Sequence, residues 1–512
     1  MIRTRPRAAR RHLVVAALWA GLLLGAVTAM AAPADVLTYH ADAARGGHYQ
    51  ADGLTWAAAA HLQPDPGFDG RVPGHIYAQP LFWQAQQGGP ELVIVATEDD
   101  VVAALDATSG QIVWQTRVGA PVPATALPCT NIDPLGITGT PVIDPTQNAL
   151  FFDAFVAGTG GPRHLAFALR LTDGTVLPGW PVDIGEALSA RGVHFVPRDQ
   201  NQRAALALLD GQVFVGFGGH TGDCGDYHGV VVGLATTTPR LTGAWVSRGR
   251  KAGVWSPGGI SIADGKLYFA TGNSERDASP AAPWDDGIGA FRVSAALLHS
   301  NDPHDFFAPR DYAKLDDEDL DLGGTVPLPV DLANGLRRLV VMGKDGKAYL
   351  LDRDNLGGIG GALAVRRVAV GSIIQAPVVY RARGETLVAF RTPGALCPEG
   401  QSTTAVMALA IDPAGLRPLW CAPIDGRGIP IVTTATAGAD PIVWVAGAEG
   451  DERLHGFRGD TGENVFASGK LPGLRHFVTP LVGGGRLYLA GDGRVFAFRW
   501  NLREAESERG RQ

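Results

Sequence analysis

The sequence predicts an all-β protein, an eight-bladed β-propeller built from four-stranded antiparallel blades. Three observations carry this prediction. A sequence motif of short apolar strands and glycine turns recurs along the chain. The strands alternate apolar and polar residues. Turn-forming residues are abundant, with Gly 68 and Pro 35 among 512 residues. A single hydrophobic core rarely grows to this length, whereas a repeat architecture does.

The repeated unit opens with a small residue or proline before an apolar strand. A glycine turn and a second strand follow, and the third strand ends in a D/T-x-G turn and an aromatic residue. The eight openings are Ala78, Gly139, Ala204, Ser256, Thr325, Gln375, Thr433 and Val478. The turn and its aromatic are clearest at 104–114, 411–420 and 457–466, and we expect this aromatic to pack between neighbouring blades.

The last unit is short of strands, and this bears on how the ring closes. Residues 478–500 hold few strands, so we expect a segment near 36–39 or 53–56 to complete their sheet. No long helical pattern interrupts the strands after residue 31. The competing arrangement is a pair of stacked β-sandwich domains, but no linker distinct from the other loops separates two halves.

The N-terminal segment has the pattern of a secretory signal peptide. Five arginines precede the apolar run 13–27, and an A-x-A site follows at 29–31. We therefore expect a signal peptide at 1–31, a single propeller at 32–505 and a disordered tail at 506–512, in a periplasmic or secreted protein. A membrane anchor is the alternative, but the apolar run is short of the ~20 residues that a spanning helix needs, so no membrane span is expected in the mature chain.

The net charge bears on the binding partners, and the cysteine content bears on disulfides and haem. A formal net charge of -7 argues against binding to nucleic acid. An exported chain with an even number of cysteines favours two disulfides, among Cys129, Cys224, Cys397 and Cys421. Because Cys397 and Cys421 lie in one unit with a strand between them, we expect these two to pair, which leaves the other two for the second bridge. No C-x-x-C-H motif is present, so no haem is expected in the chain.

One loop also combines histidine with cysteine. His220, Cys224 and His228 lie in a glycine-rich segment, 218–229, whose freedom would allow them to converge on a soft metal ion. In an exported protein, however, a cysteine is more often a disulfide partner than a ligand.

Two phrases give a specific resemblance. Val254-Trp-Ser-Pro-Gly-Gly with 266–273, and Gly343-Lys-Asp-Gly-Lys-Ala-Tyr-Leu-Leu-Asp-Arg-Asp-Asn355, resemble the blades of quinoprotein alcohol dehydrogenases. Those enzymes bind pyrroloquinoline quinone (PQQ) and calcium in an eight-bladed propeller. The pattern covers nearly all of the mature chain, although non-catalytic propellers such as the outer-membrane assembly scaffold resemble the repeat equally well.

The resemblance assigns roles to four residues. Trp255 would be the aromatic floor on which the planar quinone stacks. Asn273 would be an amide ligand of calcium, and Asp321 both a calcium ligand and the general base for the alcohol proton. Lys344 would be the cation that contacts the quinone oxygen. The alternatives are a blade-packing tryptophan, an ordinary turn asparagine and a lysine in a K-D-G hairpin turn.

The acidic run 316–321 has two alternative interpretations besides a catalytic role. It is either a solvated loop or a D-x-D-x-D calcium loop through Asp317, Asp319 and Asp321. An EF-hand is excluded, because the turn position is Leu322 rather than glycine.

The chain also departs from the family. The resemblance places Thr159 where the enzymes supply a glutamate to calcium, and the adjacent-cysteine disulfide of several of them is missing. Two functions therefore stay open: a PQQ- and calcium-dependent oxidoreductase acting on an alcohol or sugar with a degenerate metal site, or a non-catalytic binding or scaffold propeller of the cell envelope that takes a protein partner.

Overall fold

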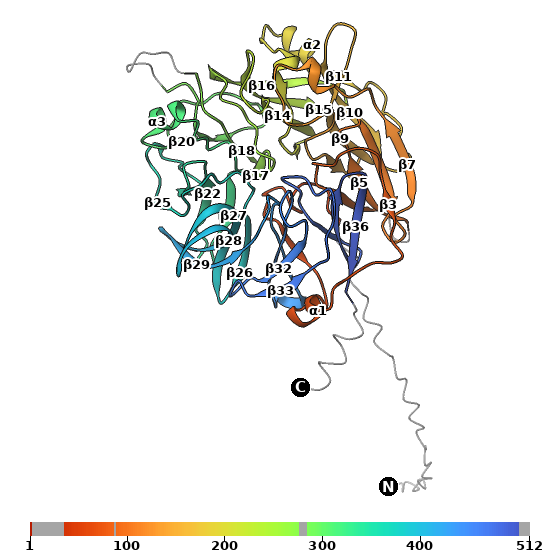
Figure 1. Ribbon diagram of the computed structural model, residues 1–512, viewed down its shortest axis with the longest axis vertical. Coiled ribbons are helices and arrows are strands. Elements are labelled where there is room, and N and C mark those ends of the chain that lie inside the picture. Colours follow the sequence, from red (N-terminus) through yellow and green to blue (C-terminus); the bar gives the residue numbers. More distant parts are fainter. Residues whose placement is uncertain (3–34, 86–88, 276–283, 501–512) are drawn as a thin grey trace. The chain divides into compact units, whose positions relative to one another are not determined.

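The computed structural model describes residues 1–2, 35–85, 89–275 and 284–500. The chain divides into two compact units, Met1–Pro33 and Ala34–Gln512, and the described helices and strands lie in the second. Apart from the first two residues, the expected signal peptide (1–31) and tail (506–512) fall outside the described residues. In the second unit eight sheets surround a common centre (Figure 1), so the predicted eight-bladed β-propeller is confirmed and the pair of sandwiches is not.

The first four blades follow one another along the chain, except that the last strand of blade 4 comes from a later part of the chain. Blade 1 contains β4 (Leu81–Gln84), β5 (Glu91–Ala96), β6 (Val101–Asp106) and β7 (Ile112–Arg117). Blade 2 contains β8 (Val142–Asp144), β9 (Ala149–Val156), β10 (Arg163–Arg170) and β11 (Val182–Asp183). Blade 3 contains β12 (Gln200–Asn201), β13 (Ala207–Leu209), β14 (Gln212–Gly219), β15 (His228–Ala235) and β16 (Arg240–Arg250). Blade 4 contains β17 (Ser261–Ala263), β18 (Lys266–Ala270), β19 (Ala290–Val293), β20 (Phe306–Ala308) and β24 (Gly358–Ile359).

Of the remaining four blades, blades 7 and 8 include strands from the N-terminal part of the unit. Blade 5 contains β21 (Leu328–Asp331), β22 (Arg337–Met342), β23 (Lys347–Asp352) and β25 (Ala364–Arg367). Blade 6 contains β26 (Val378–Ala382), β27 (Glu385–Cys397), β28 (Gly400–Asp412) and β29 (Gly415–Pro423). Blade 7 contains β1 (His48–Gln50), β30 (Ile431–Thr434), β31 (Ile442–Ala446), β32 (Leu454–Arg458) and β33 (Asn464–Ala467). Blade 8 contains β2 (Gln63–Pro64), β3 (Gly70–Arg71), β34 (Leu481–Gly483), β35 (Arg486–Gly491) and β36 (Arg494–Arg499).

The predicted unit openings match the blades. They lie a few residues before β4, β8, β13, β17, β21, β26 and β34, whereas Thr433 lies within β30. The described helices are short: α1 (Trp56–Ala60), α2 (Ile184–Ser189), α3 (Tyr312–Asp317), η1 (Ala124–Ala126), η2 (Pro197–Asp199) and η3 (Thr436–Gly438). None of the helices in the described ranges is long and apolar enough to cross a membrane.

The strands that complete the last blade and close the ring are not the segments predicted from the sequence. The strand β36 pairs antiparallel with β2 and with β3, through Gln63 opposite Arg499 and Gly70 opposite Val495. The expected segments 36–39 and 53–56 do not join this sheet. Val36 forms a bridge with Phe82 in blade 1, and 53–56 leads into α1. The prediction missed the closure because β2 and β3 are two residues long and carry no alternating pattern.

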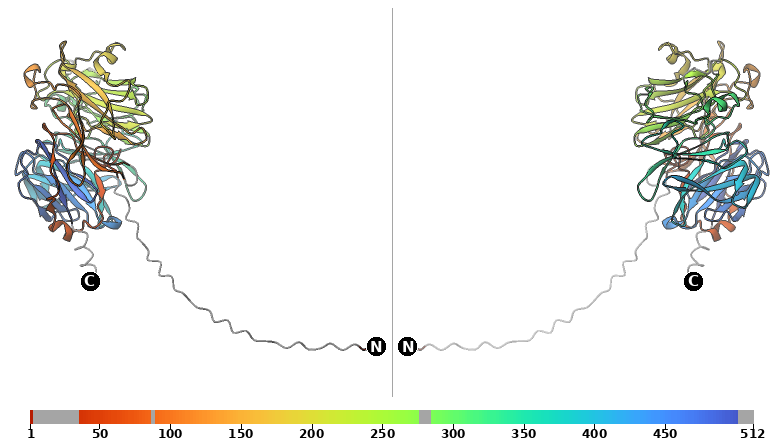
Figure 2. Two further views of the ribbon diagram at one scale, coloured as in Figure 1. Left: turned by 90° about the vertical axis from the view of Figure 1, so that its right-hand side faces the viewer. Right: turned by 90° about the vertical axis from the view of Figure 1, so that its left-hand side faces the viewer.

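The N-terminal part of the unit packs on the C-terminal blades. Figures 1 and 2 show the red helix α1 beside the blue strands that include β33, and the Trp56 indole N–H donates to the Pro441 carbonyl over 3.0 Å. The strand β1 extends the same blade by pairing in parallel with β30. Pairing between the two ends of the unit protects sheet edges that would otherwise be open.

The repeated aromatic packs between blades, as predicted. Trp114 in blade 1 donates its indole N–H to the Leu171 carbonyl of blade 2 over 2.8 Å, and Trp420 in blade 6 donates to Gly459 of blade 7 over 2.9 Å. A Cβ added to Gly462 would lie 2.6 Å from Cε3 of Trp420. At the equivalent turn of blade 2, a Cβ added to Gly174 would overlap the indole of Trp114. Glycine in the D/T-x-G turn therefore makes room for the aromatic of the preceding blade.

Two disulfides are present, with the pairing expected from the sequence. Cys397 and Cys421 join β27 to β29 within blade 6, and Cys129 joins Cys224 across a separation of 95 residues. All four cysteines of the sequence are therefore bonded.

Candidate functional site

A cavity of about 560 Å³ lies where the connections of the blades meet. Its walls combine residues that are far apart in the sequence, among them Tyr77 before blade 1, Arg203 in blade 3, Trp255 before blade 4 and Arg427 before blade 7. In a propeller the inner ends of successive blades converge on the axis, which explains why single residues from many blades share this space. The volume is within the range of small-molecule pockets, roughly 300 to 1,000 Å³.

Trp255 lines the cavity and is partly buried. Two glycines leave space for its indole: a Cβ on Gly324 would lie 3.0 Å from Cη2 of Trp255, and one on Gly272 would lie 3.2 Å from its Nε1. Larger residues there would displace the ring. The Lys344 ammonium lies over the indole, with Nζ 5.5 Å from the ring centroid, so an aromatic surface and a cation occupy the same wall.

Asp321 is buried beside this wall, and both of its carboxylate oxygens are bonded. Oδ1 accepts the backbone N–H of Asn273 over 2.6 Å, and Oδ2 lies 2.7 Å from Nζ of Lys344. Burial raises the pKa of Asp321 to about 6, while the lysine and the Asn273 N–H act against that rise. The carboxylate is therefore charged at neutral pH and close enough to titration to exchange a proton.

Lys344 lies in the turn between β22 and β23, so the hairpin interpretation describes its backbone correctly. Its backbone N–H donates to the Asp321 carbonyl over 2.8 Å, and its ammonium reaches Asp319 and Asp321, each over 2.7 Å. Burial opposes the charge, but the carboxylates outweigh it and raise the pKa of the ammonium above its usual value. The side chain is thus a fixed positive charge in the cavity.

The acidic run divides between buried and exposed residues. Asp316, at the end of α3, and Asp321 are buried, whereas 317–319 is exposed. Asp316 accepts the backbone N–H of Ser274 over 2.9 Å, just as Asp321 accepts that of the neighbouring residue. Neither a fully solvated loop nor a D-x-D-x-D calcium loop describes this arrangement, because Asp317 lies on a helix and faces solvent.

Asn273 comes to this site through its backbone. Its N–H bonds to Asp321, and it is not one of the residues that line the cavity. Thr159, which the resemblance places at a glutamate ligand, is exposed in the loop between β9 and β10 and does not line the cavity either.

The residues present do not fit calcium. Within the described ranges no group of three or more His, Cys, Asp or Glu side chains could hold a metal ion. The Asp321 oxygens that would face such an ion are already bonded to an N–H and to the ammonium of Lys344. Calcium needs six to eight oxygen ligands. Here Asp321 is bonded to the ammonium of Lys344, and neither Asn273 nor Thr159 lines the cavity.

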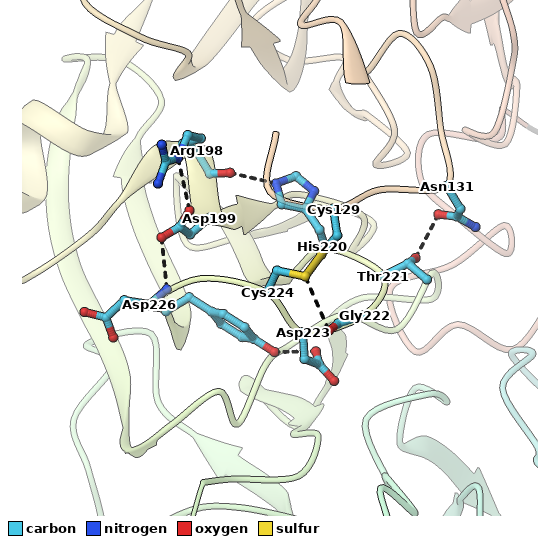
Figure 3. Close-up of a disulfide and its surroundings, with 11 residues drawn as sticks. Cys129, Asn131, Arg198, Asp199, His220, Thr221, Gly222, Asp223, Cys224 and Asp226 are labelled. Carbon is cyan, nitrogen blue, oxygen red and sulfur yellow. Dashed lines mark hydrogen bonds and ion pairs between the residues drawn. A yellow bond between two sulfur atoms is a disulfide. The ribbon is translucent and has the colours of Figure 1, made fainter. Parts of the chain in front are cut away.

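A glycine-rich loop between β14 and β15 forms another wall. Residues 219–223 line the cavity, and the Cys129–Cys224 disulfide ties the loop to the connection between blades 1 and 2 (Figure 3). Thr221 donates its hydroxyl to Asn131 over 2.8 Å, which adds a second tie to that connection. The loop is therefore held at two points on its partner.

The metal alternative for this loop does not survive. Cys224 is a disulfide partner, and the described residues hold no metal group. His220 donates Nε2–H to the Arg198 carbonyl over 3.0 Å, and burial lowers the pKa of His220 to about 4. The imidazole is neutral, and its buried Nδ1 faces no hydrogen-bond donor among the described residues.

The sequence did not reveal the basic side of the cavity. Arg203, Arg427, Arg475 and His476 line it together with Glu449, which lies 2.6 Å from Nδ1 of His476. These residues are single positions in different connections without a common motif. The glycine-rich loop has a recognisable sequence pattern, but that pattern suggests a metal site and does not point to these basic residues.

Comparison with solved structures places the fold. It is similar to quinohemoprotein alcohol dehydrogenase from Comamonas testosteroni, with a TM-score of 0.63 and 15% identity over 91% of this chain and 80% of that chain. It is also similar to a quinohemoprotein alcohol dehydrogenase from Pseudomonas putida HK5 (TM-score 0.66, 14% identity, 91% of this chain and 80% of that chain). A europium-containing methanol dehydrogenase gives a TM-score of 0.59 with 14% identity over 90% of each chain.

The chain therefore has an eight-bladed propeller fold similar to the fold of these quinoprotein dehydrogenases, as the sequence resemblance indicated. No protein-family model and no curated protein matches the sequence. At this level of identity the likeness concerns the fold, and the chemistry has to be argued from the cavity.

Proposed function

We propose that this chain is an exported oxidoreductase that binds PQQ in the cavity and oxidises an alcohol or a sugar without calcium. The observation that carries the proposal is the Asp321–Lys344 pair, 2.7 Å apart beside Trp255 on one cavity wall. A buried carboxylate with a shifted pKa, a fixed cation and an aromatic surface in one pocket are a combination that catalytic sites use. The two disulfides support export, since such bonds persist in oxidising compartments.

The cavity residues suit a planar, anionic ring system. Trp255 offers a surface for stacking, and the arginines and Lys344 offer positive charge. Two buried acceptors at the cavity, Oε1 of Gln375 and Nδ1 of His220, lack a donor among the described residues and are available to a ligand N–H or O–H. When bound, PQQ supplies the two-electron acceptor, so that oxidation of an alcohol to a carbonyl compound moves two electrons and two protons and reduces the quinone to the quinol.

The chain's own residues would handle the proton and the charge. Above about pH 6 the Asp321 carboxylate is ionised and can take the proton of a substrate hydroxyl. Lys344 holds that carboxylate in place and directs its charge to the face of Trp255, where it would stabilise negative charge on a reduced ligand. In this proposal the ammonium does the electrostatic work that a metal ion does elsewhere.

A non-catalytic binding propeller is the second candidate. The observation that favours it is that both Asp321 oxygens are bonded in the structure. A carboxylate held in this way can be a structural element of the cavity wall rather than a base. The cavity would then bind its ligand without turnover.

Dye reduction distinguishes the two candidates. Purified protein is incubated with PQQ and EDTA, and a panel of alcohols and sugars is screened with an artificial electron acceptor. We expect activity that EDTA does not remove and that falls about 10²- to 10⁴-fold in Asp321→Asn, the usual contribution of a general base. Asp319→Asn is the matched control, because Asp319 contacts the same lysine at the same 2.7 Å but its side chain is 59% exposed. Bound PQQ without turnover of any substrate would favour the binding propeller.

A further inference from the structure

We infer that Arg203 forms an anion subsite in the cavity, where it receives the carboxylate of a bound small molecule. The inference goes beyond the proposed function, because it requires a ligand in the cavity but not a quinone or a reaction. It rests on the state of the guanidinium, on its position between two cavities, and on a neighbouring hydroxyl donor.

The Arg203 guanidinium lacks a partner of its own. Among the residues that the structure describes, it makes no ion pair and no hydrogen bond, and it lies over the ring of Phe477, with Cζ 5.8 Å from the ring centroid. A guanidinium has five N–H donors in a fixed fork, which matches the two oxygens of a carboxylate. An apolar ring below these donors satisfies none of them.

The other cations of the cavity contrast with Arg203. Lys344 has two carboxylates at 2.7 Å, Arg475 has Asp492 at 2.6 Å, and Arg427 has Glu449 at 3.8 Å. Each of these charges is paired within the protein.

Glu98, the acid that acts most strongly on Arg203, does not neutralise it. Glu98 raises the pKa of the guanidinium through its charge, but burial acts more strongly and lowers that pKa from its usual value. Glu98 is itself fully buried, accepts the Gly136 N–H over 2.7 Å, and has its pKa raised by burial to about 7. It is therefore not a full negative charge at neutral pH. Arg203 is partly buried, and a cation withdrawn from water without a counter-ion is costly unless an anion joins it.

Tyr77 supplies a second donor. Like Arg203 it lines both the main cavity and a small space of about 10 Å³ beside it, so the two residues share one end of the main cavity. Its hydroxyl makes no hydrogen bond among the described residues, and burial raises its pKa to about 12, which keeps the hydroxyl protonated. A guanidinium fork and a phenol O–H together suit an oxyanion, and a neutral amide or alcohol would leave the positive charge unmatched.

The ligand chemistry is a carboxylate, and it has two possible sources. One is an acid group of the quinone, because PQQ carries carboxylates. The other is an acidic substrate that enters beside a bound cofactor. Both place a carboxylate at the same donors, so the experiment must separate them.

The test measures binding by isothermal titration calorimetry on the full-length protein without added metal. The probes are PQQ, its trimethyl ester, benzoate and benzyl alcohol. We expect wild-type protein to prefer PQQ over its ester, or benzoate over benzyl alcohol, by about 10- to 100-fold, the usual effect of a hydrogen bond between charged groups. Arg203→Gln should abolish that preference. Arg427→Gln removes the same charge from the same cavity but from a side chain that is 62% exposed, and it should change the preference less than about threefold.

The outcomes separate the sources. Loss of PQQ affinity in Arg203→Gln assigns the subsite to the cofactor, whereas benzoate binding to the PQQ-saturated protein that is lost in the variant assigns it to a substrate. Benzoate binding that depends on Arg203 in a protein that does not bind PQQ would keep the inference and remove the proposed function. An unchanged carboxylate preference in Arg203→Gln would overturn the inference whether or not PQQ binds. Should that variant fail to fold, Arg203→Lys, which keeps the charge but loses the fork, and Tyr77→Phe carry the same comparison.

Discussion

Removal of the Lys344 charge should destabilise the protein, and the effect should depend on pH. In Lys344→Met an apolar chain replaces the ammonium. The Asp321 side chain is 4% exposed, so its charge would remain buried with only the Asn273 N–H to compensate it. Loss of one partner of a buried ion pair costs about 3–5 kcal/mol. The exposed contact with Asp319 adds little.

The sign of the pH dependence follows from the pKa of Asp321. Burial raises it from 3.8 to about 6 in the folded protein, so the folded state binds the proton more tightly than the unfolded chain. This group therefore stabilises the fold below about pH 4, and that contribution, about 3 kcal/mol, is lost as the pH rises to about 6. Without Lys344 the pKa rises further, and the penalty at neutral pH grows.

Equilibrium unfolding in urea at pH 5 and pH 8, followed by tryptophan fluorescence, measures the effect. We expect Lys344→Met to lose about 3–5 kcal/mol at pH 8 and about 1 kcal/mol at pH 5, where Asp321 is mostly protonated. The double variant with Asp321→Asn should lose less at pH 8 than the sum of the two single variants. An equal loss at both pH values, or additive single losses, would refute the buried ion pair as the reason.

Three further outcomes are expected. Gly462→Ala should cost about 1–3 kcal/mol in urea unfolding, because its Cβ would lie 2.6 Å from Trp420. Gly485→Ala, with a similar positive φ but open space around it, should cost about 1 kcal/mol, and equal losses would argue against the packing role. Cys224→Ser should lower stability by about 2–5 kcal/mol and weaken ligand binding in calorimetry, because its disulfide holds a cavity wall; unchanged binding would contradict the second part. The rate of dye reduction should rise with pH, reach half of its maximum at about pH 6 as Asp321 ionises, and level off above that pH; a flat profile would exclude Asp321 as the base.

Local patterns predicted most of the fold. The turn that precedes Trp114 or Trp420 is formed by residues adjacent in sequence, and the repeated unit occurs eight times along the chain. Both the number of blades and the packing between blades could therefore be predicted. Ring closure could not, since β2 and β3 pair with β36 through two residues each. Segments this short carry no periodicity, and their position is decided by a free sheet edge at the other end of the unit.

The sequence likewise predicted some residues of the candidate site and missed others. Trp255 and Lys344 belong to phrases that resemble known blades, and the same resemblance assigns a role to Asp321 in the acidic run. The structure brings all three to one cavity. Arg203 and Tyr77 belong to no phrase, because their proximity is produced only when separate blades meet at the axis. The side chain of Asn273 was expected at a metal, whereas the structure engages its backbone N–H with Asp321. Sequence spacing locates a residue along the chain but not which of its groups reaches the site.

The most direct test of the account is a titration of the purified protein with PQQ in the presence of EDTA, with the quenching of tryptophan fluorescence as readout. The account predicts saturable one-to-one binding by the wild type, at least tenfold weaker binding by Trp255→Ala, and no effect of added calcium on either. Trp245→Phe is the matched control, since Trp245 is fully buried between blades and does not line the cavity. Absence of binding by the wild type, or binding that appears only when calcium is added, would contradict it.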